Sequence, residues 1–232
     1  MIDKSNTDNK SSNKNLRRLA LSFVLFLCLL VSYVVKRNEE IKTKLTPEAT
    51  QEKFIKEATN LYANFAKMKK DHFDFTNPYP KHVFTKKFAK YFDTQTTCND
   101  FYKDPCLWNN YTYKTLDGEI KPYFFGRPDI GQFITKNGAL YTIYSDKNNG
   151  LSLFIDINGI KGKPNRFGID LFGFYIDTNF TELRCMGETE TPYVSINLYC
   201  NPYNSNKYNG LSCTYKAALE NDYFYEVFKL LK

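Results

Sequence analysis

Two strand-like runs that flank a turn-rich loop, within residues 151–177, constrain the fold most. In each run, apolar side chains recur at every second position, and a period of two places such side chains on one face of a sheet. The loop between the runs is rich in Gly, Asn and Pro, which turns favour. We therefore predict an antiparallel hairpin whose connection is longer than a two-residue turn. The alternating residues are Leu151, Leu153, Ile155 and Ile157 in the first run, and Phe172, Phe174 and Ile176 in the second.

A third strand-like run, Leu140 to Tyr144, precedes this hairpin and lies between two Asn–Gly turn signals. We predict that strands near 140–145, 151–157 and 171–177 form an antiparallel meander. Residues 81–125 give no clear strand pattern and predict only a short helix near 81–92. The 18 Tyr and 20 Phe residues favour a globular domain over disorder.

The stretch 19–35 is apolar and uncharged, whereas residues 1–18 are polar and predict a disordered tail. A helix over this stretch would be about 26 Å long, enough to cross a bilayer core. A cleaved signal peptide would have a shorter apolar region and small residues at its end. Here the region ends in Tyr33-Val34-Val35-Lys36-Arg37. We predict an uncleaved single-pass membrane anchor.

The orientation of this anchor follows from the cysteines, because Lys and Arg are equally numerous on its two sides. Five of the six cysteines follow the anchor, which is typical of an oxidising compartment. We predict a cytoplasmic N-terminus and an extracytoplasmic head. Reduced, buried thiols in a cytosolic domain are the alternative.

An amphipathic helix is predicted after the anchor. Thr46 is a good N-cap, Pro47 suits the first helical position, and Glu48 favours the helix dipole. A coiled-coil dimer stalk is the alternative, but the apolar stripe covers only about two heptads. The predicted organisation is a tail (1–18), a transmembrane helix (19–35), a linker with the amphipathic helix (36–80) and a head (81–232). The helix's apolar face holds Phe54, Ala58, Leu61, Phe65 and Met68.

The loop of the hairpin carries an ordered set of residues that resembles a signature of bacterial type IV pilin-like proteins and type II secretion pseudopilins. A later element, Asn209 to Lys216, resembles the closing element of the same family. The resemblance implies an α+β fold, in which a long N-terminal helix, part membrane anchor and part amphipathic, packs on a small antiparallel sheet. Lys163 is one residue more than the usual loop contains. The signature residues are Asp156, Asn158, Gly159, Lys161, Gly162, Pro164, Asn165, Gly168, Asp170 and Phe172.

The same resemblance implies a structural role in the inner membrane of a bacterium, with the head in the periplasm or outside the cell. The chain would be a minor subunit or accessory part of a type IV pilus or a type II secretion pseudopilus. Its partners would be the lipid bilayer and other subunits of that kind. However, the apolar segment lacks the Glu, and its start lacks the Gly, of pilin-like precursors. This departure favours the alternative, a stand-alone anchored binding domain that does not polymerise.

The resemblance, together with closeness in sequence, pairs Cys200 with Cys213 and Cys98 with Cys106. Cys185 is then left as a free thiol. Other pairings of the five cysteines remain open, because the sequence alone does not fix connectivity.

Catalysis is not predicted, because no GxSxG, HExxH, CxxC or P-loop pattern is present and the chain has only two histidines, His72 and His82. An extracytoplasmic enzyme is the least favoured alternative. The net charge of +7 is spread along the chain, so nucleic-acid binding is not indicated. The one cofactor that the residues indicate is calcium, at Asp156, Asn158 and Asp170, because carboxylates beside an Asn–Gly turn resemble a calcium-binding loop. The competing interpretation is that Asp156 and Asn158 bond to loop amides.

Overall fold

A computed structural model describes residues 28–32, 45–78, 81–98, 113–119, 131–146, 150–159, 162–177, 179, 181–188 and 195–231. The chain divides into two units, residues 1–44 and 45–232. In the first unit, residues 28–32 are helical. Within the described ranges, no helix has the length and apolar character needed to cross a bilayer. Most of the predicted anchor, 19–35, lies outside those ranges.

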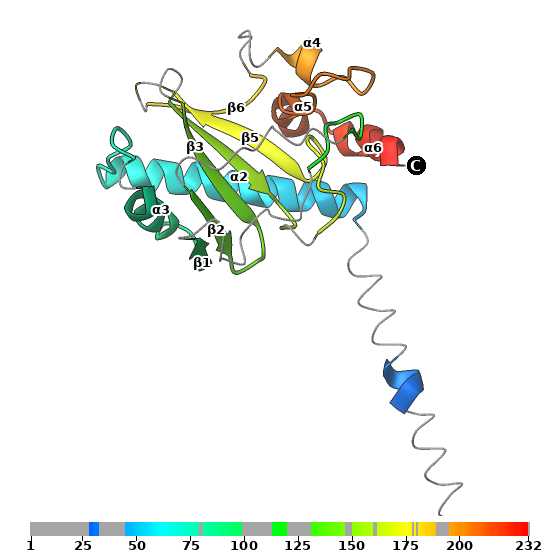
Figure 1. Ribbon diagram of the computed structural model, residues 1–232, viewed down its shortest axis with the longest axis horizontal. Helices are drawn as coiled ribbons and strands as arrows, with labels where there is room; N and C mark the ends of the chain where they lie inside the picture. The colour runs from blue at the N-terminus through cyan, green and yellow to red at the C-terminus, as the bar shows by residue number, and fades with distance from the viewer. Residues whose placement is uncertain are drawn as a thin grey trace, which may run out of the picture. The chain divides into compact units, whose positions relative to one another are not determined.

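The second unit is an α+β domain built on one six-stranded sheet, in which every neighbouring pair is antiparallel and the strands follow chain order. Figure 1 shows the helix α2 crossing the sheet, with the C-terminal helices at one end. The strands are β1 (Thr94–Cys98), β2 (Gly131–Thr135), β3 (Leu140–Asp146), β4 (Gly150–Asp156), β5 (Leu171–Ile176) and β6 (Leu183–Cys185). The helices are α2 (Pro47–Lys70), α3 (Lys81–Ala89), α4 (Ile196–Tyr199), α5 (Cys213–Leu219), α6 (Tyr223–Phe228) and the 3-10 turn η1 (Lys229–Leu231).

The predicted hairpin is confirmed as β4 and β5, the fourth and fifth strands of the sheet. Leu153 pairs with Phe174 and Ile155 with Phe172, so the apolar positions of both strands lie on the same face. The predicted three-stranded meander is part of a larger one. β1, β2 and β6 are additional strands, and β1 and β2 carry few of the strictly alternating apolar residues that predict a strand.

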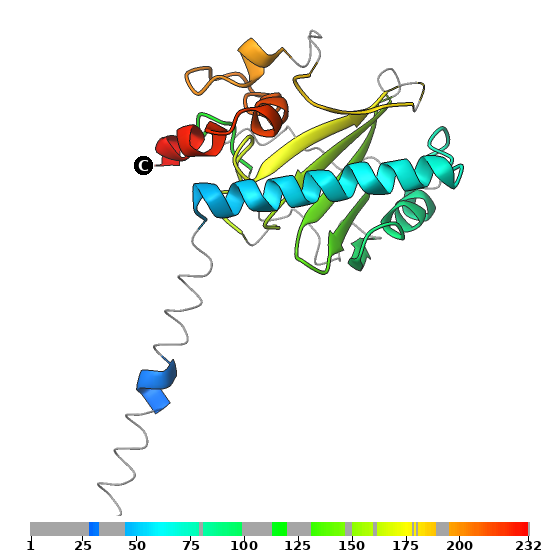
Figure 2. The same ribbon diagram turned by 180° about the vertical axis from the view of Figure 1, so that it is seen from behind.

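The predicted amphipathic helix is α2, and its start is the predicted one. The Thr46 hydroxyl oxygen accepts a hydrogen bond from the Ala49 amide at 3.2 Å, and Pro47 occupies the first helical position. Four of the five predicted apolar residues are buried, and Ala58 is partly buried against the same core. The Phe54 ring lies 4.4 Å from the Phe172 ring of β5, centroid to centroid. Figure 2 shows α2 lying along this face of the sheet.

The core on this face contains side chains from α2, α3, the sheet and α6. The opposite face of the sheet has a smaller apolar cluster, which includes Phe154 of β4 and Phe167 of the following loop. Both faces of the central strands are therefore covered. A buried carboxylate, Glu57, interrupts the apolar stripe of α2, and the apolar periodicity gave no reason to expect it.

Candidate functional site

The signature loop joins β4 to β5, and its described residues are occupied in holding the domain together. The Asp170 carboxylate accepts hydrogen bonds from the amides of Asn165 at 2.7 Å and Arg166 at 2.6 Å. Asn165 and Gly168 have positive φ angles of 54° and 74°, which Asn and Gly tolerate. At Gly168 a Cβ atom would also lie 2.8 Å from the Tyr223 hydroxyl oxygen. These residues are thus required by the path of the backbone.

Arg166, inside the same loop, ties two distant segments to the loop. Its buried guanidinium group donates hydrogen bonds to the carbonyl oxygens of Thr115, Leu116 and Leu230. The contacts to Thr115 and Leu230 are both 3.2 Å long. Segment 113–119 and the C-terminal turn are therefore anchored to the loop. Arg166 could not be identified from the sequence, because the signature leaves its position variable.

Asp156, Asn158 and Asp170, the candidate calcium ligands, come together in this loop. The Asp156 carboxylate accepts hydrogen bonds from the Tyr113 hydroxyl at 2.5 Å and from the Asn158 amide at 3.2 Å. Burial, followed by the nearby Asp170 charge, raises the pKa of Asp156 well above its ordinary value. Burial likewise raises the pKa of Asp170 to about 6, although two backbone amides oppose the shift.

These three side chains fit a calcium ion only in part. Every oxygen of the two carboxylates already accepts a hydrogen bond, and Ca²⁺ takes six to eight oxygen ligands. Among the oxygens of these three side chains, that of Asn158 is buried without a hydrogen-bond partner, which favours a cation there. In the described ranges, no group of three or more His, Cys, Asp and Glu side chains is placed to hold a metal. Lys161, another signature residue, lies outside these ranges.

The cysteines follow the predicted pairing where the structure describes them. Cys200 and Cys213 form a disulfide across 13 residues, which joins the end of α4 to the start of α5. Cys98 is disulfide-bonded, and its predicted partner Cys106 lies outside the described residues. Cys185 is free and buried, and burial raises the pKa of its thiol. A buried thiol of raised pKa is a poor nucleophile.

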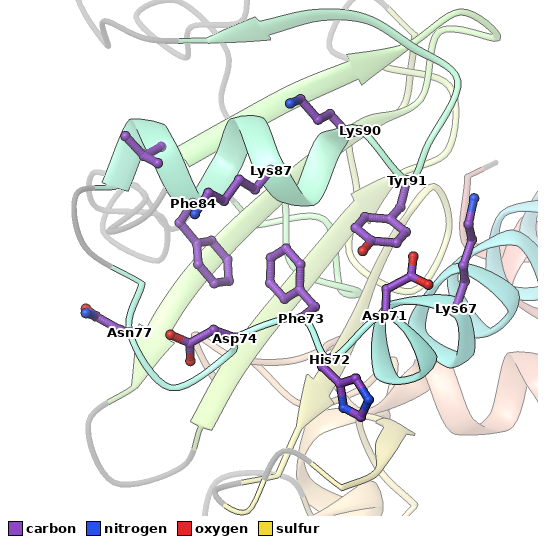
Figure 3. Close-up of a pocket in the computed structure, with 11 residues that line it drawn as sticks. Lys67, Asp71, His72, Phe73, Asp74, Asn77, Phe84, Lys87, Lys90 and Tyr91 are labelled. Atoms are coloured by element: carbon purple, nitrogen blue, oxygen red, sulfur yellow. The ribbon is translucent and has the colours of Figure 1, made fainter.

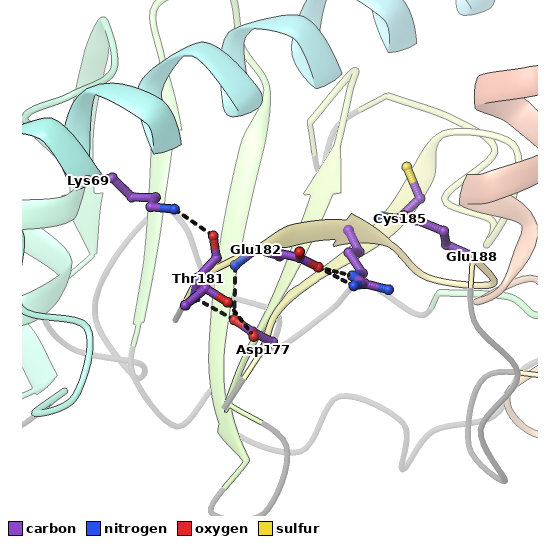
Figure 4. Close-up of polar contacts among 7 residues, drawn as sticks. Lys69, Asp177, Thr181, Glu182, Cys185 and Glu188 are labelled. Carbon is purple, nitrogen blue, oxygen red and sulfur yellow. Dashed lines mark hydrogen bonds and ion pairs between the residues drawn. The ribbon is translucent and has the colours of Figure 1, made fainter. Parts of the chain in front are cut away.

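A shallow groove of about 580 Å³ lies between α2 and the edge strand β6. The Lys69 ammonium group donates to the carbonyl oxygen of Thr181 at 2.7 Å, which fastens the end of α2 to the β5–β6 loop. That loop is held by Asp177, whose carboxylate accepts from the Thr181 amide, the Thr181 hydroxyl and the Glu182 amide (Figure 4). The polar groups of this groove are largely paired with one another.

The outer edge of β6 is closed at Cys185 by Glu188. The Asp177 amide donates a hydrogen bond to the Glu182 carbonyl oxygen, and the Met186 amide donates one to the Gly173 carbonyl oxygen. Because backbone groups alternate in direction along a strand, those of Cys185 face away from β5. The Cys185 amide donates to the Glu188 carboxylate at 3.3 Å, and the Cys185 carbonyl oxygen accepts from the Glu188 amide at 3.2 Å. The edge groups at Cys185 are therefore satisfied within the chain.

The second hollow is a pocket of about 570 Å³ at the C-terminal end of α2, which we call the α2–α3 pocket. It is lined by the last turn of α2, the loop to α3, the outer side of α3 and Tyr91. Figure 3 shows Phe73 at its centre, with Phe84 and Tyr91 on either side and lysines around it. In the sequence, only the two histidines drew attention to this region. His72 lies on its border, and the side chain of His82 lies outside the described part.

Comparison of the chain with models of protein families, with curated proteins and with solved structures gives no match.

Proposed function

We propose that the chain is a membrane-anchored, pilin-like structural protein that acts through contacts with other proteins rather than through catalysis. The supporting observation is the relation of two elements. The helix α2, which follows the apolar segment in sequence, packs across a sheet whose β4–β5 connection contains the signature residues. An amphipathic helix on an antiparallel sheet is the coarser part of the arrangement that the resemblance implies, and it supports the proposal.

A non-catalytic role agrees with the chemistry of the described residues. Three reactive side chains of the described domain are already buried or hydrogen-bonded. Cys185 is buried with a raised thiol pKa, and the two buried aspartates bond to loop groups. The proposed location is the inner membrane of a bacterium, with residues 19–35 in the bilayer and the head outside the cytoplasm. The proposed role is a minor or accessory subunit of a type IV pilus or a type II secretion pseudopilus.

The alternative function is an anchored binding domain that does not polymerise. It is favoured by one sequence observation, the absence of a Glu within the apolar segment and of a Gly before it. In pilin-like proteins this Glu is thought to pair with the N-terminal amine of a neighbouring subunit, and a carboxylate within a membrane requires such a partner.

Intact-mass measurement of the membrane-extracted chain separates the two functions. A mature chain that begins between Leu16 and Phe23 would support processing and assembly, whereas a full-length chain would support the stand-alone domain.

Oxidative cross-linking provides a second test, because Cys28 is an exposed free thiol in the apolar segment. Neighbouring anchors in an assembly are expected to give a Cys28-linked dimer, which the variant Cys28→Ser should not form. An entirely monomeric wild-type chain in native membranes would contradict assembly through the anchor.

A further inference from the structure

The α2–α3 pocket is lined by three lysines against two aspartates, so positive charge is in excess there. Lys67, Lys87 and Lys90 line it and are exposed, and none of them forms an ion pair with a described carboxylate. The Lys67 ammonium group instead lies 5.7 Å from the centroid of the Tyr91 ring. These three side chains come from the last turn of α2, from α3 and from the residues after it.

Two acidic residues, Asp71 and Asp74, also line the pocket. The Asp74 carboxylate accepts from the Thr76 amide at 2.9 Å and from the Thr76 hydroxyl at 2.6 Å. Burial, and then the nearby Asp71 carboxylate, raises the pKa of the Tyr91 hydroxyl. Hydrogen bonds from Thr76, and to a smaller extent the Lys87 charge, lower the pKa of Asp74. Three ammonium groups against two carboxylates leave the pocket with an excess of positive charge.

The base of the pocket is a preformed aromatic cluster. Phe73 is half-buried and packs edge-to-face on Phe84, Phe88 and Tyr91, with centroid distances of 5.4, 6.1 and 5.8 Å. Such contacts fix ring orientation without closing the exposed side of Phe73. A volume of about 570 Å³ lies in the range of natural ligand pockets.

His72, on the border of the pocket, has a backbone conformation that costs free energy. Its φ of 52° lies in the left-handed region, at a helix end where Gly is usual. The turn at His72 places the next residue, Phe73, against Phe84 and Phe88 of α3.

We propose that the α2–α3 pocket binds an acidic peptide segment of a partner protein. One aromatic or aliphatic side chain of the segment would pack on Phe73, and its carboxylates would pair with Lys67, Lys87 and Lys90. Three separate ammonium groups around an apolar base suit a ligand whose negative charges are spread around an apolar group. This site is independent of whether the chain polymerises, so the failure of one proposal leaves the other standing.

The test uses the full chain in a non-ionic detergent and a fluorescent, glutamate-rich peptide with a central phenylalanine. The double variant Lys87→Glu/Lys90→Glu should weaken binding at least about tenfold, as expected when attractive pairs become repulsive. The matched control is Lys53→Glu/Lys56→Glu, which makes the same charge change on exposed residues of α2. Because α2 rises about 1.5 Å per residue, Lys53 lies about 21 Å from Lys67 along the helix. The control should change affinity less than about twofold.

Two further arms distinguish the proposed ligand from its competitors. Phe73→Leu should weaken binding of the peptide that has a central phenylalanine, but not binding of a peptide with alanine at that position. Only the phenylalanine side chain packs on the Phe73 ring. Glycerophosphoserine, a soluble lipid headgroup, should not displace the peptide at equal concentration. An equal loss of affinity in both lysine double variants would show that the attraction is non-specific, and would overturn the proposal. Displacement by the headgroup would overturn it in favour of a lipid site. Circular dichroism of each variant confirms that it is folded.

Discussion

The Glu57 carboxylate of α2 accepts a hydrogen bond from the Tyr141 hydroxyl of β3 at 2.7 Å, in the interior of the domain. Both residues are buried, and the side-chain amide of Asn137 donates to the other Glu57 oxygen. Burial, and then the Glu57 charge, raises the pKa of Tyr141 well above its ordinary value. This contact fixes the position of α2 against the sheet, which apolar packing alone would leave freer to slide.

Removal of one partner should therefore be costly. Tyr141→Phe leaves the buried Glu57 carboxylate without one donor, and we expect a loss of about 1.5–3 kcal/mol in the free energy of unfolding. The double variant Tyr141→Phe/Glu57→Met should lose less than the sum of its single changes. Urea denaturation measures each value. Tyr225→Phe, on the exposed side of α6, should stay within about 0.5 kcal/mol. Strict additivity of the two changes would contradict the coupling.

The buried Asp156–Asp170 pair predicts a pH dependence of stability. Raised folded-state pKa values mean that the folded state binds more protons than the unfolded state between about pH 4 and the raised values. Their contribution to stability is thus present below about pH 4 and is lost as the pH rises through about 6 and above. Asp156→Asn removes this loss, so its melting temperature should rise relative to wild type between pH 4 and 7.

Asp177 provides a control of opposite sign. Burial acts to raise its pKa, but hydrogen bonds from Glu182 and Thr181 outweigh burial and lower it. Its stabilisation is present above about pH 4 and is lost as the pH falls through the folded-state pKa. The deficit of Asp177→Asn should therefore grow as the pH rises from about 3 to 5. Parallel curves for Asp156→Asn and wild type would contradict the interpretation of the buried pair.

His72→Gly should stabilise the domain, because glycine adopts the left-handed conformation without steric cost. The amide of His72 bonds to the Lys69 carbonyl oxygen and that of Phe73 to the Met68 carbonyl oxygen, which is the usual geometry of a glycine-ended helix. We expect a gain of about 0.5–1 kcal/mol after the greater flexibility of unfolded glycine is included. Thermal denaturation measures it. His72→Ala should give no such gain, and equal stabilisation by both variants would show that strain is not the cause.

The Cys200–Cys213 disulfide should contribute about 3 kcal/mol, the value for closing a loop of this size in the unfolded chain. Denaturation of Cys200→Ala/Cys213→Ala against wild type, both under oxidising conditions, tests this value. Cys185→Ala is the control, since it removes a buried sulfur without opening a cross-link, and it should cost less than half as much. Non-reducing peptide mapping should find Cys98 joined to Cys106.

Calcium should not change stability. The carboxylate oxygens of Asp156 and Asp170 already accept hydrogen bonds, so an ion would have to displace donors such as the Tyr113 hydroxyl. We expect the same melting temperature in excess calcium and in EGTA at neutral pH. If calcium raised the melting temperature of the wild type but not that of Asp156→Asn, the site would instead be established, with Asn158 as its third ligand.

The parts of the fold that could be predicted are those where sequence period and burial agree. The alternating residues of β4 and β5 and the apolar stripe of α2 are local patterns, and each determines an element and the face that it buries. β1 and β2 could not be predicted in this way. β1 reads Thr-Gln-Thr-Thr-Cys, without a strong apolar alternation, and it is a strand because β2 pairs with it.

The candidate sites depend on contacts between residues distant in sequence. The Glu57–Tyr141 bond joins positions 84 residues apart, and Arg166 reaches carbonyls 50 to 64 residues away. No local sequence pattern predicts a contact between residues so far apart. The α2–α3 pocket is closer to a readable pattern, because its aromatic and lysine residues lie within 67–91. Their convergence, however, depends on the chain reversal at His72.

The closed edge of β6 has a consequence for how copies of this protein can join. With the Cys185 amide and carbonyl both used by Glu188, an incoming strand would find no free backbone partner at that position. An added strand could therefore not form a continuous ladder across Cys185. Contacts with a neighbouring molecule at that position would have to use side-chain surfaces, which tolerate rotation and exchange of neighbours more readily than a hydrogen-bonded ladder does.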